Sequence, residues 1–158
     1  MQDIHIESKN NVFKLRVSGI FIQDNKLLVV QHRNNNFCCL PGGHIEIGED
    51  SKSAVIREMK EETLLNLTVS KLLCIAENIY TIRGKKVHEL CYYYIMKSET
   101  KVETKNWSYI EMDKGHETPL NFYWYDLSDQ NSIQFKPYFI LNKLKLHNSK
   151  FEHIIKKQ

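Results

Sequence analysis

Residues 42–65 read GGHIEIGEDSKSAVIREMKEETLL, a glycine-rich loop that runs directly into a short acidic segment. No Pro or Gly lies between Asp50 and Thr63, and Asp50 or Ser51 can cap the first free backbone N–H groups of a helix. The segment also supplies regularly spaced apolar positions, namely Ala54, Val55, Ile56 and Met59. This pattern predicts an α-helix over about 50–63.

Three carboxylates fall on one face of the predicted helix. Glu58, Glu61 and Glu62 are spaced i, i+3, i+4, which brings side chains together at 3.6 residues per turn. Like charges at this spacing repel by a few tenths of a kcal/mol per pair, so solvent or a cation must neutralise them. A hard divalent ion, Mg²⁺ or Mn²⁺, is the natural counter-charge for carboxylate oxygens. A solvated acidic face is the alternative interpretation of this spacing alone.

The loop before the helix suits an anionic ligand. Gly42 and Gly43 allow the backbone to turn sharply and to approach a ligand closely. A helix N-terminus beside exposed N–H groups favours anionic oxygens, although glycines also make plain turns. Arg57 can pair with a carboxylate such as Glu49, which would fix the loop against the helix.

The spacing of these residues resembles the Nudix box, G-x5-E-x7-R-E-U-x-E-E-x-G-U, where U is aliphatic. Gly43, Glu49 and the run from Arg57 to Leu65 match every fixed position except one, because Leu64 stands where the box has its last glycine. A leucine in the left-handed conformation of such a helix end costs about 1–2 kcal/mol. We therefore expect either strain at Leu64 or a different helix end that uses Asn66.

The resemblance implies an α/β fold, a Nudix-like α/β/α sandwich with a mixed β-sheet. It covers a core of about residues 12–146 within one predicted domain, residues 1–158. The implied activity is metal-dependent hydrolysis of the pyrophosphate bond of a nucleoside diphosphate linked to another group X. The substrate is thus a small nucleoside diphosphate derivative, the cofactor is Mg²⁺, for which Mn²⁺ can substitute, and a homodimer is possible.

The resemblance also assigns roles to residues. It implies Glu58, Glu61 and Glu62 as metal ligands, and Glu58 as the residue that handles the attacking water. Glu58, Arg57 and Glu61 form the predicted catalytic set, with Gly42 and Gly43 next to the substrate. Two alternatives stay open: a catalytically silent nucleotide-binding or regulatory module, and an isopentenyl diphosphate isomerase, for which no Cys and Glu pair can be assigned.

Strand-like runs surround the box. Residues 12–22 and 26–33 predict a hairpin that turns at Gln23-Asp24-Asn25, and Arg16 and Arg33 on it are candidates to bind substrate phosphates or are simply solvated. Residues 67–80 and 87–97 predict a second hairpin. Its Glu77-Asn78 and His88-Glu89 resemble a pattern in a subset of Nudix proteins, so Glu89 either approaches the metal site or pairs with Lys85 or Lys86.

The remaining segments are less informative. Residues 98–120 are polar and predict a connecting loop, in which Glu103, Glu111 and Glu117 are candidates for an additional carboxylate or are surface charges. Residues 122–127 predict a strand, with Trp124 in the core or over a ligand. Pro137 opens a predicted helix that extends to about Leu146, with Lys143 on its solvated face.

Composition sets limits on function. The chain has 158 residues, 42% of them hydrophobic and 26% charged, which is typical of a globular protein. A net charge of +3 is too small to indicate a nucleic-acid partner. The four cysteines have no C-x-x-C spacing and are predicted to be core thiols. No signal region or membrane-length apolar run is present, which predicts a cytoplasmic location and no membrane association.

Overall fold

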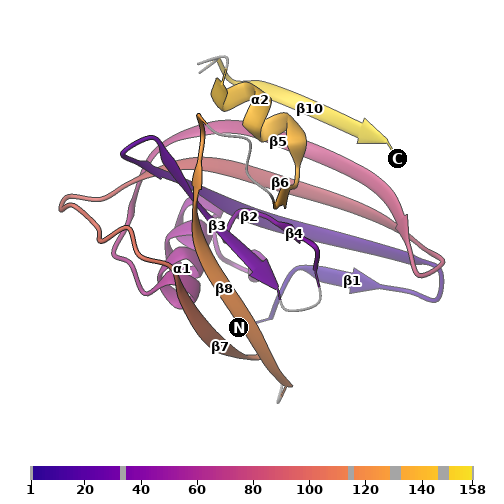
Figure 1. Ribbon diagram of the computed structural model, residues 1–158. Coiled ribbons are helices and arrows are strands. Elements are labelled where there is room, and N and C mark those ends of the chain that lie inside the picture. The colour runs from indigo at the N-terminus through magenta and orange to yellow at the C-terminus, as the bar shows by residue number, and fades with distance from the viewer. Residues whose placement is uncertain (1, 33–34, 114–115, 129–132, 146–149, 158) are drawn as a thin grey trace.

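The computed structural model describes residues 2–32, 35–113, 116–128, 133–145 and 150–157 (Figure 1). These residues form two helices and ten strands. In chain order the elements are β1 (His5–Glu7), β2 (Asn11–Gln23), β3 (Lys26–His32), β4 (Phe37–Cys38), α1 (Ser51–Thr63), β5 (Thr68–Ile82), β6 (Lys85–Lys97), β7 (Trp107–Asp113), β8 (His116–Asp126), β9 (Gln134–Phe135), α2 (Tyr138–Lys145) and β10 (Glu152–Lys157).

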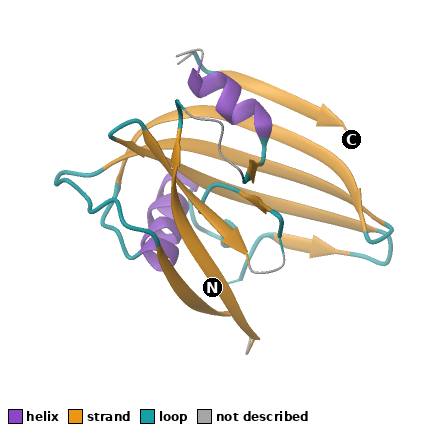
Figure 2. Ribbon diagram, viewed as in Figure 1, coloured by secondary structure: helices purple, strands orange, loops and turns teal. Residues whose placement is uncertain are grey.

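Most strands belong to one mixed sheet of eight strands (Figure 2). Its order is β10-β5-β6-β2-β3-β8-β7, and β1 pairs with β2 beside this path. The pairs β2–β6 and β10–β5 are parallel, whereas the other pairs in the sheet are antiparallel. The predicted mixed sheet is therefore confirmed. The crossover segment that connects β2 to its parallel partner β6 contains α1.

Two separate apolar clusters cover the two faces of the sheet. The first joins Val55 and Met59 of α1 to side chains of β2, β3, β6 and β8. The second joins Ile140 and Leu141 of α2 to side chains of β2, β3, β5 and β6. Helix, sheet and helix thus form three layers, which confirms the predicted α/β/α sandwich. No helix in the described parts of the chain is long and apolar enough to cross a membrane.

Both predicted hairpins form. β2 and β3 are joined through Asp24 and Asn25, whose φ angles are 51° and 61°. β5 and β6 are joined through Arg83 and Gly84, whose φ angles are 50° and 76°. Positive φ at both central residues matches the right-handed twist of the flanking strands, which is why short hairpins select such turns.

The predicted loop over residues 98–120 is wrong for its second half. Trp107–Asp113 and the beginning of His116–Asp126 form the antiparallel pair β7 and β8, so the predicted strand at 122–127 starts earlier. Trp107 stacks on Phe122 with ring centroids 4.8 Å apart. Charged residues interrupt this region of the sequence, and so its alternating inward side chains, Trp107 and Tyr109, did not produce a clear apolar run.

The helix predicted after Pro137 is α2, and Leu146 at its predicted end lies outside the described residues. The prediction that Lys143 is solvated is wrong, because its side chain is only 3% exposed. Its Nζ lies 2.7 Å from Glu152 Oε2 and donates to Lys150 O at 2.8 Å. The cause is β10, which pairs with β5 and lies against α2, a tertiary contact that helical periodicity does not reveal.

The cysteines behave as the sequence predicts. Cys38, Cys74 and Cys91 are buried free thiols, and Cys39 is partly buried and also free. Burial raises the pKa of Cys38 and Cys91 to about 11 and that of Cys39 and Cys74 to about 12. These thiols are therefore packing groups at neutral pH.

Candidate active site

The glycine-rich loop lies along the free edge of β2. Gly19 N donates to Pro41 O, Val17 N donates to Gly43 O, and Ile45 N donates to Leu15 O, each at 3.0 Å. The loop therefore continues the sheet in place of a strand. At Gly42 the φ angle is 142°, and a Cβ there would lie 2.3 Å from Val17 O, so only glycine fits this close approach.

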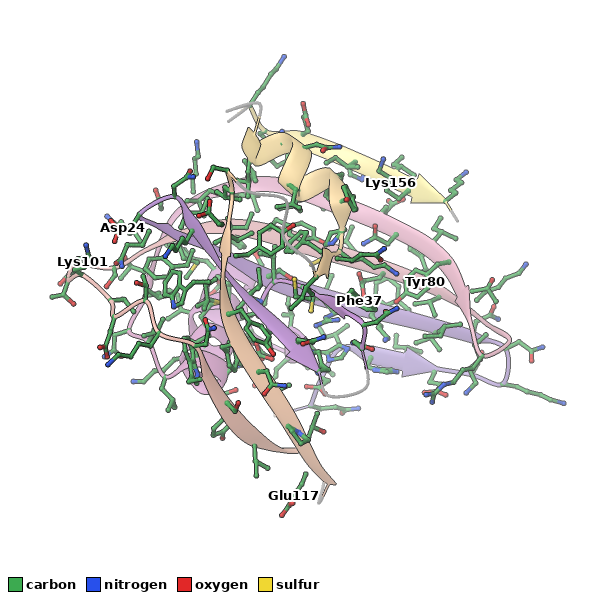
Figure 3. All side chains as sticks on the ribbon, viewed as in Figure 1. Asp24, Phe37, Tyr80, Lys101, Glu117 and Lys156 are labelled. Atoms are coloured by element: carbon green, nitrogen blue, oxygen red, sulfur yellow. The ribbon has the colours of Figure 1, made fainter. Side chains whose placement is uncertain are left out.

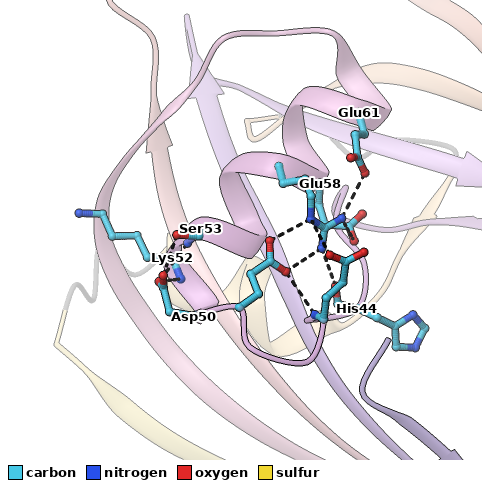
Figure 4. Close-up of polar contacts among 9 residues, drawn as sticks. His44, Asp50, Lys52, Ser53, Glu58 and Glu61 are labelled. Carbon is cyan, nitrogen blue, oxygen red and sulfur yellow. Dashed lines mark hydrogen bonds and ion pairs between the residues drawn. The ribbon is translucent and has the colours of Figure 1, made fainter. Parts of the chain in front are cut away.

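Helix α1 begins where the sequence predicts. Asp50 is its N-cap, and Oδ1 accepts hydrogen bonds from Lys52 N at 2.9 Å and Ser53 N at 3.0 Å (Figure 4). Val55 and Met59 are fully buried against the sheet. Arg57, Glu58 and Glu61 lie on the side of the helix that faces the loop, where Arg57 bonds to Glu49 and to His44 O, Glu58 lies against Gly43, and Glu61 accepts a hydrogen bond from Arg57.

Arg57 connects the helix to the loop. Its Nε and Nη2 donate to the two carboxylate oxygens of Glu49, each at 2.9 Å, and Nη2 also donates to His44 O at 3.0 Å. These bonds to Glu49 raise the pKa of Arg57 far above the usual arginine value. The predicted pairing of Arg57 with Glu49 is confirmed. A bidentate arginine–carboxylate pair fixes both distance and orientation, so the helix and the loop are held in one register.

The same guanidinium brings two predicted metal ligands together. Arg57 Nη1 donates to Glu58 Oε1 at 2.9 Å and to Glu61 Oε2 at 3.1 Å (Figure 4). Two carboxylates thus converge on one cationic N–H group. Glu58 and Glu61 lie on adjacent turns of the helix, and this contact shows that both can bind the same positively charged group.

Glu58 lies tightly against the loop backbone. A Cβ on Gly43 would be 2.3 Å from Glu58 Oε2, so the glycine leaves space for this carboxylate. Burial raises the pKa of Glu58 to about 7, Arg57 opposes the rise, and the charge of Glu61 adds to it. The pKa of the Glu58 carboxyl group therefore lies near neutral pH, and a proton or a cation stabilises the group in this buried position.

The third predicted ligand, Glu62, has a different partner. Its residue is only 6% exposed, and Oε2 accepts a hydrogen bond from Gly42 N at 2.8 Å. Within the described ranges, no three His, Cys, Asp or Glu side chains are grouped closely enough to hold a metal ion. The donor chemistry nevertheless fits a hard divalent cation, because all three side chains offer carboxylate oxygens and two of them already share a cationic partner.

Arg16, a predicted phosphate-binding residue, lies behind the loop. Its Nη2 donates to Gly42 O at 3.1 Å, and its Nη1 is 3.8 Å from Glu89 Oε2. Among the described atoms its Nε is buried and has no hydrogen-bond partner. The Arg16 side chain therefore contacts the backbone of the glycine-rich loop at Gly42. The second arginine of that prediction, Arg33, lies outside the described residues.

Glu89 does not make the contact with Lys85 or Lys86 that the sequence offered as one possibility. Its Oε1 accepts from Asn78 Nδ2 at 3.1 Å, and its other oxygen faces Arg16. Lys85 instead pairs with Glu7 of β1. The link from Asn78 through Glu89 to the glycine loop was absent from the sequence prediction, because β2 and β6 are far apart in the sequence and nothing local indicates that they pair.

The loop carboxylates proposed as additional ligands differ in their placement. Glu103 is exposed and pairs with Lys105 at 2.5 Å. Glu117 is exposed near the end of the β7–β8 hairpin, as Figure 3 shows. The Glu111 side chain lies outside the described part of the structure, although its backbone pairs with Thr118. Trp124 contacts Phe21 in the core, with ring centroids 5.8 Å apart.

Leu64 ends α1 in the conformation that the missing glycine would take. Its φ and ψ are 61° and 10°, in the left-handed region, and its N–H donates to Lys60 O at 2.9 Å. The side chain is 68% exposed, so little packing compensates for the backbone strain. Of the two expectations, strain at Leu64 is confirmed, and the alternative end at Asn66 is wrong.

The three-layer fold with a glycine loop clamped to an acidic helix defines an α/β protein whose site suits a cation and an anionic ligand. The model of the NUDIX domain family matches residues 13–137. The chain belongs to the Nudix family.

Relatives agree with this assignment. The chain is 50% identical over 60 residues to an ADP-ribose pyrophosphatase of Methanocaldococcus jannaschii, and the aligned region covers 36% of each protein. It is 41% identical over 66 residues to an m7GpppN-mRNA hydrolase of Danio rerio, which covers 37% of this chain and 22% of that protein. These matches span well under half the length of the relatives.

Solved structures show the same fold. The alignment with a MutT Nudix hydrolase of Burkholderia pseudomallei has a TM-score of 0.57 and 20% identity, and it covers 82% of this chain and 95% of the other chain. The alignment with an ADP-ribose pyrophosphatase of Streptococcus suis has a TM-score of 0.55 and 18% identity, and it covers 90% of this chain and 98% of the other chain.

Proposed function

We propose that this protein is a metal-dependent pyrophosphohydrolase that cleaves a nucleoside diphosphate linked to a group X, giving a nucleoside monophosphate and phosphorylated X. The observation that carries the proposal is the convergence of Glu58 and Glu61 on one nitrogen of Arg57, beside the backbone of Gly43. Family membership and the names of the M. jannaschii and S. suis relatives support the same reaction.

Glu58, Glu61 and Glu62 would hold the Mg²⁺, or Mn²⁺ in its place. When bound, such an ion neutralises charge on phosphoryl oxygens and lowers the pKa of a coordinated water. Glu58 and Glu61 would then exchange part of their contact with Arg57 Nη1 for the cation. Arg57 keeps its bidentate contact with Glu49, so the loop and the helix stay in register.

Glu58 is the residue that we assign to the attacking water. Burial raises its pKa to about 7 in the metal-free protein, and a bound cation would favour the ionised carboxylate, which is the form that can accept a proton from the water. Gly42 and Gly43 let the backbone approach the diphosphate, and Arg16, whose Nη2 donates to Gly42 O, lies directly behind them. In the hydrolysis the water oxygen forms a new bond to one phosphorus and a proton of the water passes to the Glu58 carboxylate, while the bond from that phosphorus to the bridging oxygen breaks and the bridging oxygen leaves with the other phosphate.

Every nucleoside diphosphate derivative carries the same diphosphate, so this group does not determine which X the protein accepts. The relatives that carry the name ADP-ribose pyrophosphatase make ADP-ribose the first compound to test, and the mRNA hydrolase makes a capped dinucleotide the second. A homodimer is one option that the family resemblance leaves open, and light scattering tests it, because a dimer should give twice the 18.7 kDa mass of one chain. The cytoplasmic location stays a prediction.

The decisive experiment is an activity screen of the purified protein against nucleoside diphosphate derivatives with Mg²⁺, with Mn²⁺ and with EDTA. We expect metal-dependent release of a nucleoside monophosphate from at least one compound. Silence across the panel, together with thermal stabilisation by one of the compounds, would favour the alternative of a binding or regulatory module.

Two matched variants test the metal ligands. Glu61→Gln should remove most of the turnover and leave the fold intact, because its exposed carboxylate makes little contribution to packing. Glu99→Gln, at an exposed carboxylate just after β6, is the control and should keep the wild-type rate. Full activity in Glu61→Gln would show that the metal assignment is wrong.

A further inference from the structure

A chain of four polar contacts connects the β5–β6 hairpin to Glu62. Asn78 Nδ2 donates to Glu89 Oε1 at 3.1 Å, and Glu89 Oε2 lies 3.8 Å from Arg16 Nη1. Arg16 Nη2 donates to Gly42 O at 3.1 Å, and Gly42 N donates to Glu62 Oε2 at 2.8 Å. Three strands of the sheet are thus connected through one glycine to a predicted metal ligand.

The sheet itself fixes the first members of this chain. Asn78 and Glu89 are direct partners in the antiparallel β5–β6 register. Arg16 pairs with Cys91, two residues beyond Glu89 in the parallel β2–β6 register, and so Arg16 and Glu89 project from the same face. The Glu89 side chain is only 13% exposed, and solvent therefore screens its attraction for Arg16 weakly.

Gly42 is the member that most needs an external restraint. Glycine has the greatest backbone freedom of any residue, and Gly42 has a φ of 142°, which few other residues adopt. Both of its hydrogen-bonding groups are used, since its C=O accepts from Arg16 and its N–H donates to Glu62. The N–H and the C=O of Gly42 belong to adjacent peptide planes that meet at its Cα, and the first plane is also held by the hydrogen bond from Gly19 N to Pro41 O. Arg16 therefore acts on the Gly42 N–H through the φ and ψ angles of Gly42.

We infer that Glu89 is a positioning residue for Glu62. By holding Arg16 on the Gly42 carbonyl, Glu89 fixes the Gly42 N–H and thereby the carboxylate that binds it. Without Glu89, the Arg16 charge would be free to move toward Glu62, with which it already interacts electrostatically. The inference rests on the proposed function in one respect, namely that Glu62 holds the metal ion.

The test compares two carboxylates of the same hairpin. Glu89→Gln removes the charge that holds Arg16, whereas Glu77→Gln removes a charge next to Asn78 that contacts His88 and His153 instead. We expect Glu89→Gln to weaken Mn²⁺ binding, measured by calorimetry, about tenfold. The Mg²⁺ concentration for half-maximal hydrolysis should rise in parallel, and KM at saturating metal should change little. Glu77→Gln should stay near wild type in all three.

A double-mutant cycle separates positioning from direct ligation. Arg16→Met removes the intermediate residue, so adding Glu89→Gln to it should weaken Mn²⁺ binding no further. Fully additive losses would mean that Glu89 acts on the metal independently of Arg16, which would overturn the inference. Asn78→Ala, which removes only the donor to Glu89, should shift Mn²⁺ binding less and in the same direction, and it provides a milder variant if Arg16→Met does not fold.

Hydrogen exchange gives a readout that needs no metal. The amide of Gly42 should exchange faster in Glu89→Gln than in wild type, because its hydrogen bond to Glu62 is loosened, and should be unchanged in Glu77→Gln. Unchanged exchange in Glu89→Gln would contradict the inference. If the wild type neither binds Mn²⁺ nor hydrolyses any compound, the proposed function fails, and the exchange result still decides whether Glu89 positions the loop.

Discussion

Arg57 and Glu49 form a two-point ion pair in which Nε and Nη2 of the arginine each lie 2.9 Å from a different oxygen of the carboxylate. The pair is mostly shielded from solvent, since the side chains are 24% and 10% exposed. It joins the last residues of the loop to the middle of α1. The order of the site therefore depends on a contact that itself does not need to touch the substrate.

Replacing this pair should lower both stability and activity. Glu49→Gln and Arg57→Lys each remove the bidentate geometry, and we expect each to lower the free energy of unfolding by about 1–3 kcal/mol. The loss of activity should exceed what the unfolded fraction accounts for. Urea denaturation and steady-state rates on the same samples provide the measurement, and a variant that loses stability but keeps the wild-type kcat would contradict this role.

Adding one methyl group at Gly43 should separate activity from stability. In Gly43→Ala the new Cβ would meet Glu58 Oε2 at 2.3 Å, so the carboxylate must move and the rate should fall at least about tenfold. Gly84→Ala is the matched control, because that glycine has open space but a φ of 76°. It should cost about 1 kcal/mol of stability and leave the rate unchanged. Equal rates for the two variants would refute the proposed packing.

Leu64 offers a route to a more stable protein. Leu64→Gly relieves the left-handed strain and loses little packing, because the leucine is 68% exposed. We expect a gain of up to about 1 kcal/mol in the free energy of unfolding, reduced by the greater entropy of glycine in the unfolded chain. Leu64→Ala keeps the Cβ and should show no comparable gain. Thermal unfolding of the three proteins gives the ranking.

His44 should make stability depend on pH. Burial and, second to it, the charge of Arg16 lower its pKa from 6.5 to about 4. The unfolded chain therefore binds the proton more readily between these values, so the stability that neutral His44 contributes is complete above pH 6.5 and is lost as the pH falls toward 4. The expected loss is on the order of 2 kcal/mol.

The control for this effect is His44→Phe, which keeps an aromatic ring beside His5 and cannot titrate. The difference in stability between the wild type and this variant should shrink or reverse from pH 7 to pH 4. A constant difference for His44→Phe over this range would show that the histidine does not titrate as described.

The parts of the site that are close in sequence could be predicted from it. Helix α1 and the pairing of Arg57 with Glu49 follow from spacing, because helical periodicity fixes which side chains share a face. The sequence offered Asp50 or Ser51 as the cap, and the structure shows Asp50. The strained end at Leu64 was one of two options that the sequence left open. Only the backbone geometry decided between them.

The parts that the sequence did not show depend on contacts between distant segments. Arg16 faces Glu89 only because β2 and β6 pair in parallel, and no local pattern encodes that choice of neighbour. Lys143 is buried because β10 lies beside α2. The β7–β8 hairpin was missed because the segment before it is rich in charged residues and polar residues such as Ser108 and Asn121 alternate with its inward side chains, and burial of one face is decided by the rest of the fold.

The parallel pairing of β2 with β6 also has a consequence for the order of events during synthesis. Every pair in this ladder joins residues 75 positions apart, as Arg16 and Cys91 do. Contacts of this sequence separation form late, because the entropy of closing the intervening loop must be overcome first. Helix α1 can form locally as soon as it leaves the ribosome, whereas Arg16 has no Glu89 to face until β6 has been made. We therefore expect a nascent chain that stops before Lys85 to contain the complete Nudix box and yet to lack a working site.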